Sequence, residues 1–247
     1  VLASVLVSPI AAARAAGTGE WIGTWAASPQ PVWDADFPIP TGFPRALWNQ
    51  TIRQIATVSI GGKQVRIVLS NEYGTRPLVV GAAHVAVSDK GAIEAGSDRT
   101  LTFGGHASIT IPPGAPAISD PVDLTVAPFA SLAVSLFLPE VTPTTTTHWE
   151  GVQTAYIAAG NKVSDADVKA DSTTVSRLFL SEILVDAAPG ARAIVTFGDS
   201  ITDGNGSAVD ANHRWPDLLA RRLAKAGGAP VAVLNEGISG AKVLSDR

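Results

Sequence analysis

The chain has 247 residues, of which 46% are hydrophobic and 16% are charged, a composition that excludes intrinsic disorder and fits two folded domains. The formal net charge is −4 and the basic residues are scattered, so we expect neither a nucleic-acid nor an anionic-lipid partner. The absence of cysteine excludes disulfides, thiol catalysis and thiolate metal sites.

The first residues, VLASVLVSPIAAARAAG, are apolar and then small. Ala11-Ala12-Ala13 and Ala13-Arg14-Ala15 each fit the cleavage pattern of a secretory signal. The run is too short for a bilayer span, which takes about 20 apolar residues, and an ordinary apolar helix is the alternative interpretation. We interpret residues 1–16 as a signal-peptide remnant, which predicts a secreted or periplasmic protein with no membrane span.

Residues 17–190 are predicted to form an all-β sandwich of the jelly-roll kind. Runs rich in Val, Ile, Leu and Thr, often alternating with polar residues, are separated by turn residues. RQIATVSI leads through Gly61-Gly62 to KQVRIVLS, a connection typical of a two-residue hairpin. The further predicted strands are PLVVGAAHVAV, RTLTF, ASITI, DLTV, SLAVSLFL, TAYIAA and SRLFLSEILV.

The predicted loops of this domain contain many prolines and several aromatic residues. Aromatic side chains in such loops can stack on sugar rings, although they more often pin the loop to its own domain. A non-catalytic carbohydrate-binding protein is therefore an alternative function. Its candidate contact residues are Trp33, Phe37, Trp48 and Trp149.

The pattern changes after the small-residue hinge AAPGARA at 187–193. Residues 193–197 form a continuous apolar run and predict a strand, and PVAVLNEG predicts a second buried strand. Between them RWPDLLARRLAKAGG predicts a helix, with Pro216 in its first turn and Gly227 after its end. Residues 191–247 are thus predicted to begin an α/β domain with a parallel sheet. The helix is expected to pack through Trp215, Leu218 and Leu219.

Ser200 in AIVTFGDSITDG follows the first of these two strands, where α/β folds place their chemistry. Gly198 permits a tight turn before it. The general nucleophile elbow G-x-S-x-G is not met, because Thr202 occupies the place of the second glycine. Ser200 is a candidate nucleophile of another kind, and a plain strand-to-loop turn is the alternative.

TFGDSITDG resembles the first sequence block of the GDSL, or SGNH, hydrolases, and VLNEGISGAKVL resembles their second block. The resemblance implies a three-layer α/β hydrolase domain and a serine esterase with no metal or organic cofactor. It implies Ser200 as nucleophile and backbone donor, and Gly240 as the oxyanion-hole glycine. VRIVLSNEYGTRPLVVGAAHVAV and SDPVDLTV resemble the β-rich first domain of a bacterial two-domain subfamily.

Two further residues are interpreted as supports for the site. Asp199 is expected to hydrogen-bond the turn, and Asn235, at a strand end, to brace the two loops. In the family, a later Asn adds an oxyanion donor and a late D-x-x-H supplies the acid and base. The resemblance implies that these blocks lie beyond residue 247, either on a remaining C-terminal fragment that would be a partner of this chain or on a segment that is simply missing.

The four histidines do not offer an evident base for Ser200. DANH, residues 210–213, fits D-x-x-H, but it follows Ser200 by only ten residues. We interpret it as a loop and helix N-cap, with Asp210 and His213 not forming the catalytic pair. The other histidines show no ligand spacing and are interpreted as surface or turn residues: His84, His106 and His148.

The leading hypothesis is an exported esterase that hydrolyses carboxylic esters, such as acetyl esters of carbohydrates, through an acyl-enzyme on Ser200. An inactive truncated hydrolase is a third hypothesis beside the carbohydrate-binding protein. The sequence leaves the identity of the ester and the oligomeric state open.

Overall fold

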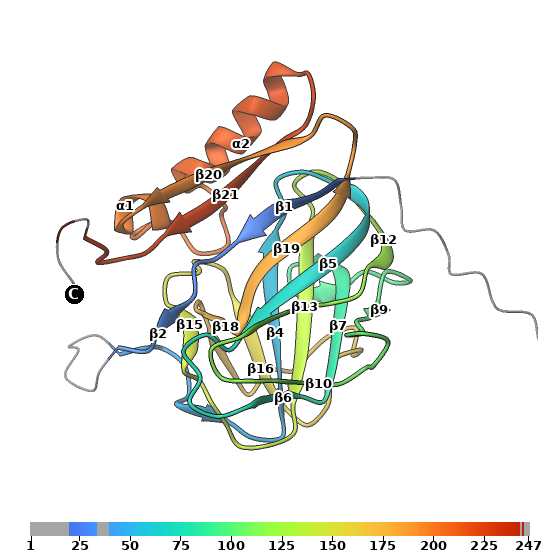
Figure 1. Cartoon of the computed structure of the whole chain (residues 1–247), viewed down its shortest axis with the longest axis vertical. Helices are drawn as coiled ribbons and strands as arrows, with labels where there is room; N and C mark the ends of the chain where they lie inside the picture. The colour runs from blue at the N-terminus through green and yellow to red at the C-terminus, as the bar shows by residue number, and fades with distance from the viewer. Residues whose placement is uncertain (1–19, 34–39, 243, 245–247) are drawn as a thin grey trace, which may run out of the picture.

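The computed structural model describes residues 20–33, 40–242 and 244 (Figure 1). The expected signal remnant at 1–16 and the loop residue Phe37 lie outside the described residues. Neither helix in the described ranges has the length and hydropathy that crossing a membrane requires. The described chain is mostly β-strand.

One large sheet has the strand order β1-β19-β5-β11, with β12 also paired to β5. Every neighbouring pair in it is antiparallel. In β5 the buried residues Val65, Ile67 and Leu69 alternate with partly exposed ones, which is the pattern of a strand with one face on a core. The bounds are β1 Glu20–Ala26, β5 Gly62–Ser70, β11 Pro116–Ile118, β12 Val122–Val126 and β19 Leu180–Ala187.

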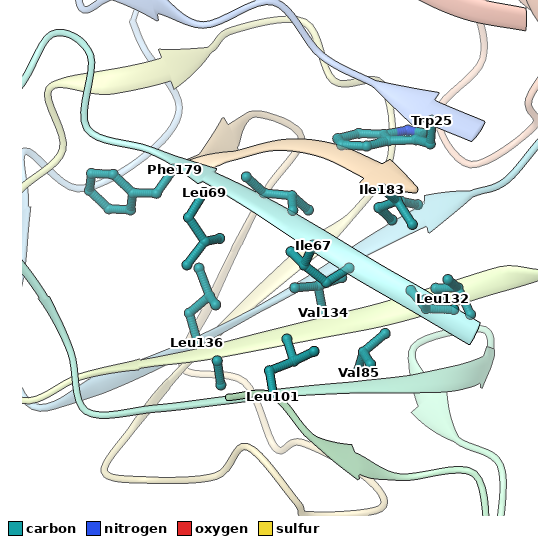
Figure 2. Packing of buried hydrophobic residues seen from close by; sticks show 14 of the residues in the cluster. Trp25, Ile67, Leu69, Val85, Leu101, Leu132, Val134, Leu136, Phe179 and Ile183 are labelled. Carbon is teal, nitrogen blue, oxygen red and sulfur yellow. The ribbon is translucent and has the colours of Figure 1, made fainter. Parts of the chain in front are cut away.

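The second large sheet has the order β17-β16-β4-β13-β7-β8, with β9 paired to β7. Its buried side chains meet those of the first sheet. Figure 2 shows Ile67 and Leu69 of β5 packed toward Val134 and Leu136 of β13. The predicted N-terminal β-sandwich is therefore confirmed. The bounds are β4 Gln50–Thr57, β7 Ala82–Asp89, β8 Ala92–Ile93, β9 Arg99–Thr100, β13 Ser131–Leu138, β16 Ala155–Ala159 and β17 Ser172–Thr174.

Short strands form small sheets around the sandwich. Their bounds are β2 Gln30–Pro31, β3 Ala46–Leu47, β6 Leu78–Val80, β10 Ile109–Ile111, β14 Thr142–Pro143, β15 Thr146–His148 and β18 Arg177–Leu178. The sheet β18-β15-β2 contains β15, which ends at His148. The Thr-rich segment before Trp149, which the proline and threonine content of residues 139–151 predicts as an exposed loop, is thus partly a strand, in which Thr146 and Thr147 are buried.

The hairpin predicted at Gly61-Gly62 is wrong. The strand before the glycines, β4, pairs with β13 and β16, whereas the strand after them, β5, pairs with β19, β11 and β12. The two glycines carry the chain from one sheet to the other. A Cβ on Gly61 would lie 2.2 Å from the Val126 carbonyl oxygen, so the close approach of two backbones requires glycine here.

The C-terminal elements form a parallel pair of strands and two helices beside β1, at one end of the sandwich (Figure 1). The pair β20 and β21 runs in register from Arg192↔Val231 to Gly198↔Gly237. Only residues 188–191 separate β19 from β20, in agreement with the predicted hinge. The bounds are β20 Arg192–Gly198, α1 Ser200–Asp203, α2 Trp215–Ala226 and β21 Val231–Gly237.

The helix α2 forms where the sequence predicts it, with Pro216 at its start and Gly227 as its C-cap. Its packing face is different from the expected one. The buried residues are Pro216 and Ala220, while Trp215 is 43% exposed and Leu218 is 39% exposed. The small residues let the helix lie close to β21, while the third expected residue, Leu219, is only partly buried.

Candidate active site

The loop after β20 presents Ser200 at the first position of α1. A Cβ on Gly198 would lie 2.2 Å from Oγ1 of Thr202, so glycine is required for the chain to fold back this tightly. The Asp199 carboxylate caps the helix by accepting the N–H of Ile201 at 3.0 Å. Because Ser200 begins the helix, its own N–H has no acceptor within it and is free to serve a substrate oxygen.

The loop after β21 lies directly beside this turn. The N–H of Ile238 donates to the Gly198 carbonyl at 3.0 Å. A Cβ on Gly237 would lie 2.2 Å from the Asp203 nitrogen, so the end of β21 touches the end of α1. Gly240 follows in this second loop with φ +81°, a conformation that favours glycine. The structure thus brings the segments of Ser200 and Gly240 onto neighbouring loops.

Asn235 is buried between the two loops. Its side-chain Nδ2 donates to the Thr202 carbonyl at 2.9 Å, and its Oδ1 accepts the N–H of Gly237 at 3.0 Å. One amide therefore ties α1 to the end of β21. Both ends of the Asn235 amide are thus engaged in backbone contacts.

Asp203, which sequence reasoning did not single out, is a buried side chain with three hydrogen bonds. Its Oδ1 lies 3.0 Å from Nε2 of His148, and its Oδ2 accepts the N–H and the hydroxyl of Ser239, each at 2.9 Å. The side chains of His148 and Asp203 are only 4% and 2% exposed. The interpretation of His148 as a surface or turn residue is therefore wrong, because this histidine is buried where the sandwich meets α1.

Glu150 adds a second contact from the same segment of the sandwich. Its carboxylate accepts the amide of Asn205 at 2.7 Å and also accepts the hydroxyl of Ser239. Asn205 follows α1, and Ser239 immediately precedes Gly240. His148 and Glu150 thus contact both loops of the candidate site.

Two carboxyl groups, on β19 and β21, lie in the seam where β1 and β19 of the sandwich meet β21. Burial raises the pKa of Glu182, and the charge of Glu236 raises it further. Burial also raises the pKa of Glu236, opposed by a hydrogen bond from the Ser28 hydroxyl and by the charge of His148. The seam therefore favours the protonated form of both groups.

The DANH segment is arranged differently from a catalytic dyad. The carboxylate of Asp210 accepts the N–H and the hydroxyl of Thr154, each at 2.7 Å, while His213 is exposed. The segment does not supply the helix N-cap either, which corrects that expectation. The N-cap is Arg214, whose backbone N–H donates to Asp217 at 3.0 Å.

The remaining histidines are also engaged elsewhere or exposed. Nδ1 of His84 lies 2.8 Å from the Asp98 carboxylate in the sandwich, and His106 is exposed. In the described part of the chain, the Ser200 hydroxyl has no hydrogen bond to any histidine. A general base for Ser200 is therefore not found among the described residues.

The aromatic residues of the proline-rich loops divide into two kinds. Trp33 and Trp149 pack on each other, with ring centroids 4.4 Å apart and an interplanar angle of 51°. Trp48 is 68% exposed. The paired tryptophans pin their loops together, whereas Trp48 presents its ring to solvent.

A serine on a sharp turn after a parallel strand thus lies beside a glycine-containing loop that follows the next strand. Residues 196–247 match the model of the GDSL-like Lipase/Acylhydrolase family. The matched segment holds Ser200, Asp203, Asn235 and Gly240. The resemblance carried by the two sequence blocks is thereby confirmed for this segment, and it supports a hydrolase of the esterase or lipase kind. A comparison with curated proteins gives no match.

Proposed function

We propose that the protein is an exported serine esterase that hydrolyses carboxylic esters through an acyl-enzyme on Ser200. The observation that carries the proposal is the pairing of the Ser200 turn with the Gly240 loop, within a segment that matches the GDSL-like family. The apolar N-terminal segment at 1–16 supports export. The domains are then a sandwich at 17–190 and an α/β three-layer hydrolase domain that begins at 191.

The proposed chemistry is acyl transfer. The Ser200 hydroxyl attacks the ester carbonyl, and the alcohol leaves as the acyl-enzyme forms. The developing oxyanion is stabilised by the N–H groups of Ser200 and Gly240, each such donor being worth about 3 to 4 kcal/mol. Water then attacks the acyl-enzyme and releases the acid. No step uses a metal or an organic cofactor, and acetyl esters of carbohydrates are one suitable substrate class.

The base is proposed to come from a segment beyond residue 247 that covers the open side of β20. Val195 is 57% exposed, Phe197 is 82% exposed and Ile201 is 76% exposed. Strands of parallel sheets are normally covered by helices on both faces and paired along their edges. Among the described residues β20 pairs only with β21, so its free edge and its apolar side call for further strands and helices of the same domain. A histidine and an Asn donor carried by those strands would reach the Ser200 hydroxyl across the crevice.

The proposal is tested by Ser200→Ala in the full gene product, with p-nitrophenyl acetate as substrate. We expect kcat to fall by roughly 10⁴-fold, because the nucleophile is lost, and the thermal midpoint to stay unchanged. Ser207→Ala, another partly exposed serine near α1, is the matched control and should keep its activity. A fluorophosphonate should label Ser200, as located by peptide mass. Activity retained in Ser200→Ala would refute the proposal.

A carbohydrate-binding protein is the second candidate, favoured by the exposed ring of Trp48. It predicts that the native protein retains polysaccharide on an affinity gel, that Trp48→Ala abolishes retention, and that no ester is hydrolysed. An inactive truncated hydrolase would show neither property.

A further inference from the structure

The sandwich reaches into the candidate active site through the end of β15. Nδ1 of His148 lies 3.1 Å from the carbonyl oxygen of Ser28, and Nε2 lies 3.0 Å from Oδ1 of Asp203. A carbonyl oxygen only accepts, so Nδ1 carries a proton. The second bond holds one more proton between Nε2 and the carboxylate. His148 therefore ties the backbone of the sandwich to the last residue of α1.

Asp203 passes this contact to the second loop. Its other oxygen accepts both the N–H and the hydroxyl of Ser239, the residue before Gly240. Ser200 lies three positions before Asp203 in the same helix. One carboxylate thus connects the turn of the candidate nucleophile with the loop of the candidate oxyanion glycine, and His148 fixes that carboxylate.

Burial prevents water from replacing the bond between His148 and Asp203. With side-chain exposures of 4% and 2%, His148 and Asp203 have little access to water as a replacement partner. Loss of the histidine bond would leave a buried carboxylate without one of its donors, and α1 or the Ser239 loop would move to bring that oxygen to water or another donor. The contact of Glu150 with Ser239 and Asn205 cannot replace it, since a carboxylate offers no donor to Asp203.

We propose that His148 is a positioning residue of the esterase site, by which the β-sandwich holds Asp203 and, through it, the backbone N–H groups at Ser200 and Gly240. This catalytic consequence rests on the proposed function, whereas the physical coupling does not. His148 is not itself the base, because both ring nitrogens are engaged and the ring is buried. The sandwich is then a part of the active site and not only a neighbouring domain.

Two neutral variants separate the two bonds of His148. In His148→Gln the amide nitrogen lies near the place of Nε2 and can still donate to Asp203, while in His148→Asn the shorter amide can serve only the Ser28 carbonyl. We expect His148→Asn to lower kcat by about 10- to 100-fold with KM changed less than about twofold, because the affected donors act mainly in the transition state. His148→Gln should recover most of kcat.

The matched control is the second histidine–carboxylate pair, His84 with Asp98, in the sandwich. His84→Asn and His84→Gln should lower the thermal midpoint without changing kcat per folded molecule. The proposal would be overturned if the two His148 variants lost kcat equally and in proportion to their loss of folded protein. His148 would then have a structural role only.

Hydrogen–deuterium exchange of the full gene product tests the coupling without turnover. His148→Asn should speed amide exchange in peptides covering 200–205 and 237–242, His148→Gln much less, and the His84 variants not at all. Unchanged exchange in both peptides would overturn the inference even if Ser200→Ala abolishes hydrolysis. Faster exchange there, with hydrolysis retained in Ser200→Ala, would uphold the coupling and refute only the esterase function.

Discussion

Asp203 shows how a single residue can join two loops of a site. A buried carboxylate is costly unless each oxygen has donors, and breaking a buried charged pair commonly costs about 3 to 5 kcal/mol. Both oxygens of Asp203 are satisfied, by His148 on one side and Ser239 on the other. The same bonds that permit its burial also fix the two loops relative to each other.

The conformation of Gly240 leads to a prediction at the same scale. Gly240→Val in the full gene product should lower kcat for p-nitrophenyl acetate by roughly 100-fold or more with a smaller effect on KM. Its φ of +81° is strained for a β-branched residue, so the loop would turn its N–H away from the oxyanion. Steady-state kinetics of Gly240→Val and of the native protein measure the effect on kcat and KM.

The control for backbone strain alone is Gly160→Val, in a sandwich loop with φ +75° and open space around it. It should lose a similar amount of stability and keep its kcat. If Gly240→Val keeps kcat as well, the N–H of Gly240 does not serve the oxyanion.

The sequence locates the candidate nucleophile but not its supports. Ser200 and Gly240 stand in short motifs after predicted strands, so local order is enough to find them. The partner of Asp203 is 55 residues away in the chain, at the end of a Thr-rich segment with no motif. That contact exists only because the sandwich folds β15 against α1, which no local pattern encodes.

At the scale of elements, strands were predictable and their pairing was not. Apolar alternation marks β5, which has one face on the core, whereas β4 and β13 are buried along most of their length and β13 is marked by its apolar content. A pair of glycines can form a hairpin turn or permit a close contact between backbones. At Gly61-Gly62 the second use applies, because the chain passes from one sheet to the other there. The sequence analysis expected α2 to pack through its large apolar residues. The helix instead packs on β21 through Pro216 and Ala220, whose small side chains allow a closer approach.

The raised pKa of Glu182, in the seam where β1 and β19 meet β21, predicts a pH effect on stability. The folded protein raises the pKa of Glu182 above the ordinary value of 4.5, so it binds the proton more tightly than the unfolded chain does. Its contribution to stability is therefore present below pH 4.5 and is lost as the pH rises through the folded pKa. Glu182→Gln should raise the thermal midpoint at pH 8, with a difference that shrinks toward zero below pH 4.5.

Calorimetry between pH 8 and a pH below 4.5 measures the thermal midpoints of the native protein and of Glu182→Gln, with Glu72→Gln as the exposed control. The control should shift the midpoint little at any pH. A Glu182→Gln midpoint that is lower than that of the native protein at pH 8 would mean that the ionised carboxylate has a stabilising partner in the seam.

At the scale of the whole molecule, the sandwich and the parallel pair form a continuous contact. The strand β1 packs on β21, and the N–H of Val233 donates to the Ser59 hydroxyl at 3.1 Å. The edge of β21 is thus covered by the sandwich, whereas β20 faces outward with its apolar side chains. One side of this small sheet is therefore buried against the sandwich, whereas apolar side chains of β20 are exposed.

The open side of β20 gives a prediction for the 1–247 polypeptide itself. Phe197 is 82% exposed, so Phe197→Ser removes little buried surface and should change the thermal midpoint by less than about 2 °C, while lowering the fluorescence of bound anilinonaphthalene sulfonate. Phe179→Ser, at a residue 2% exposed in the core, should cost about 3 to 5 kcal/mol by the cavity it leaves.

In the full gene product Phe197→Ser should instead reduce both stability and ester hydrolysis, because the proposed segment would pack on that ring. An equally large loss of stability from Phe197→Ser and Phe179→Ser in the 1–247 polypeptide would show that residues of this chain already cover β20, and the base would then have to be sought among them.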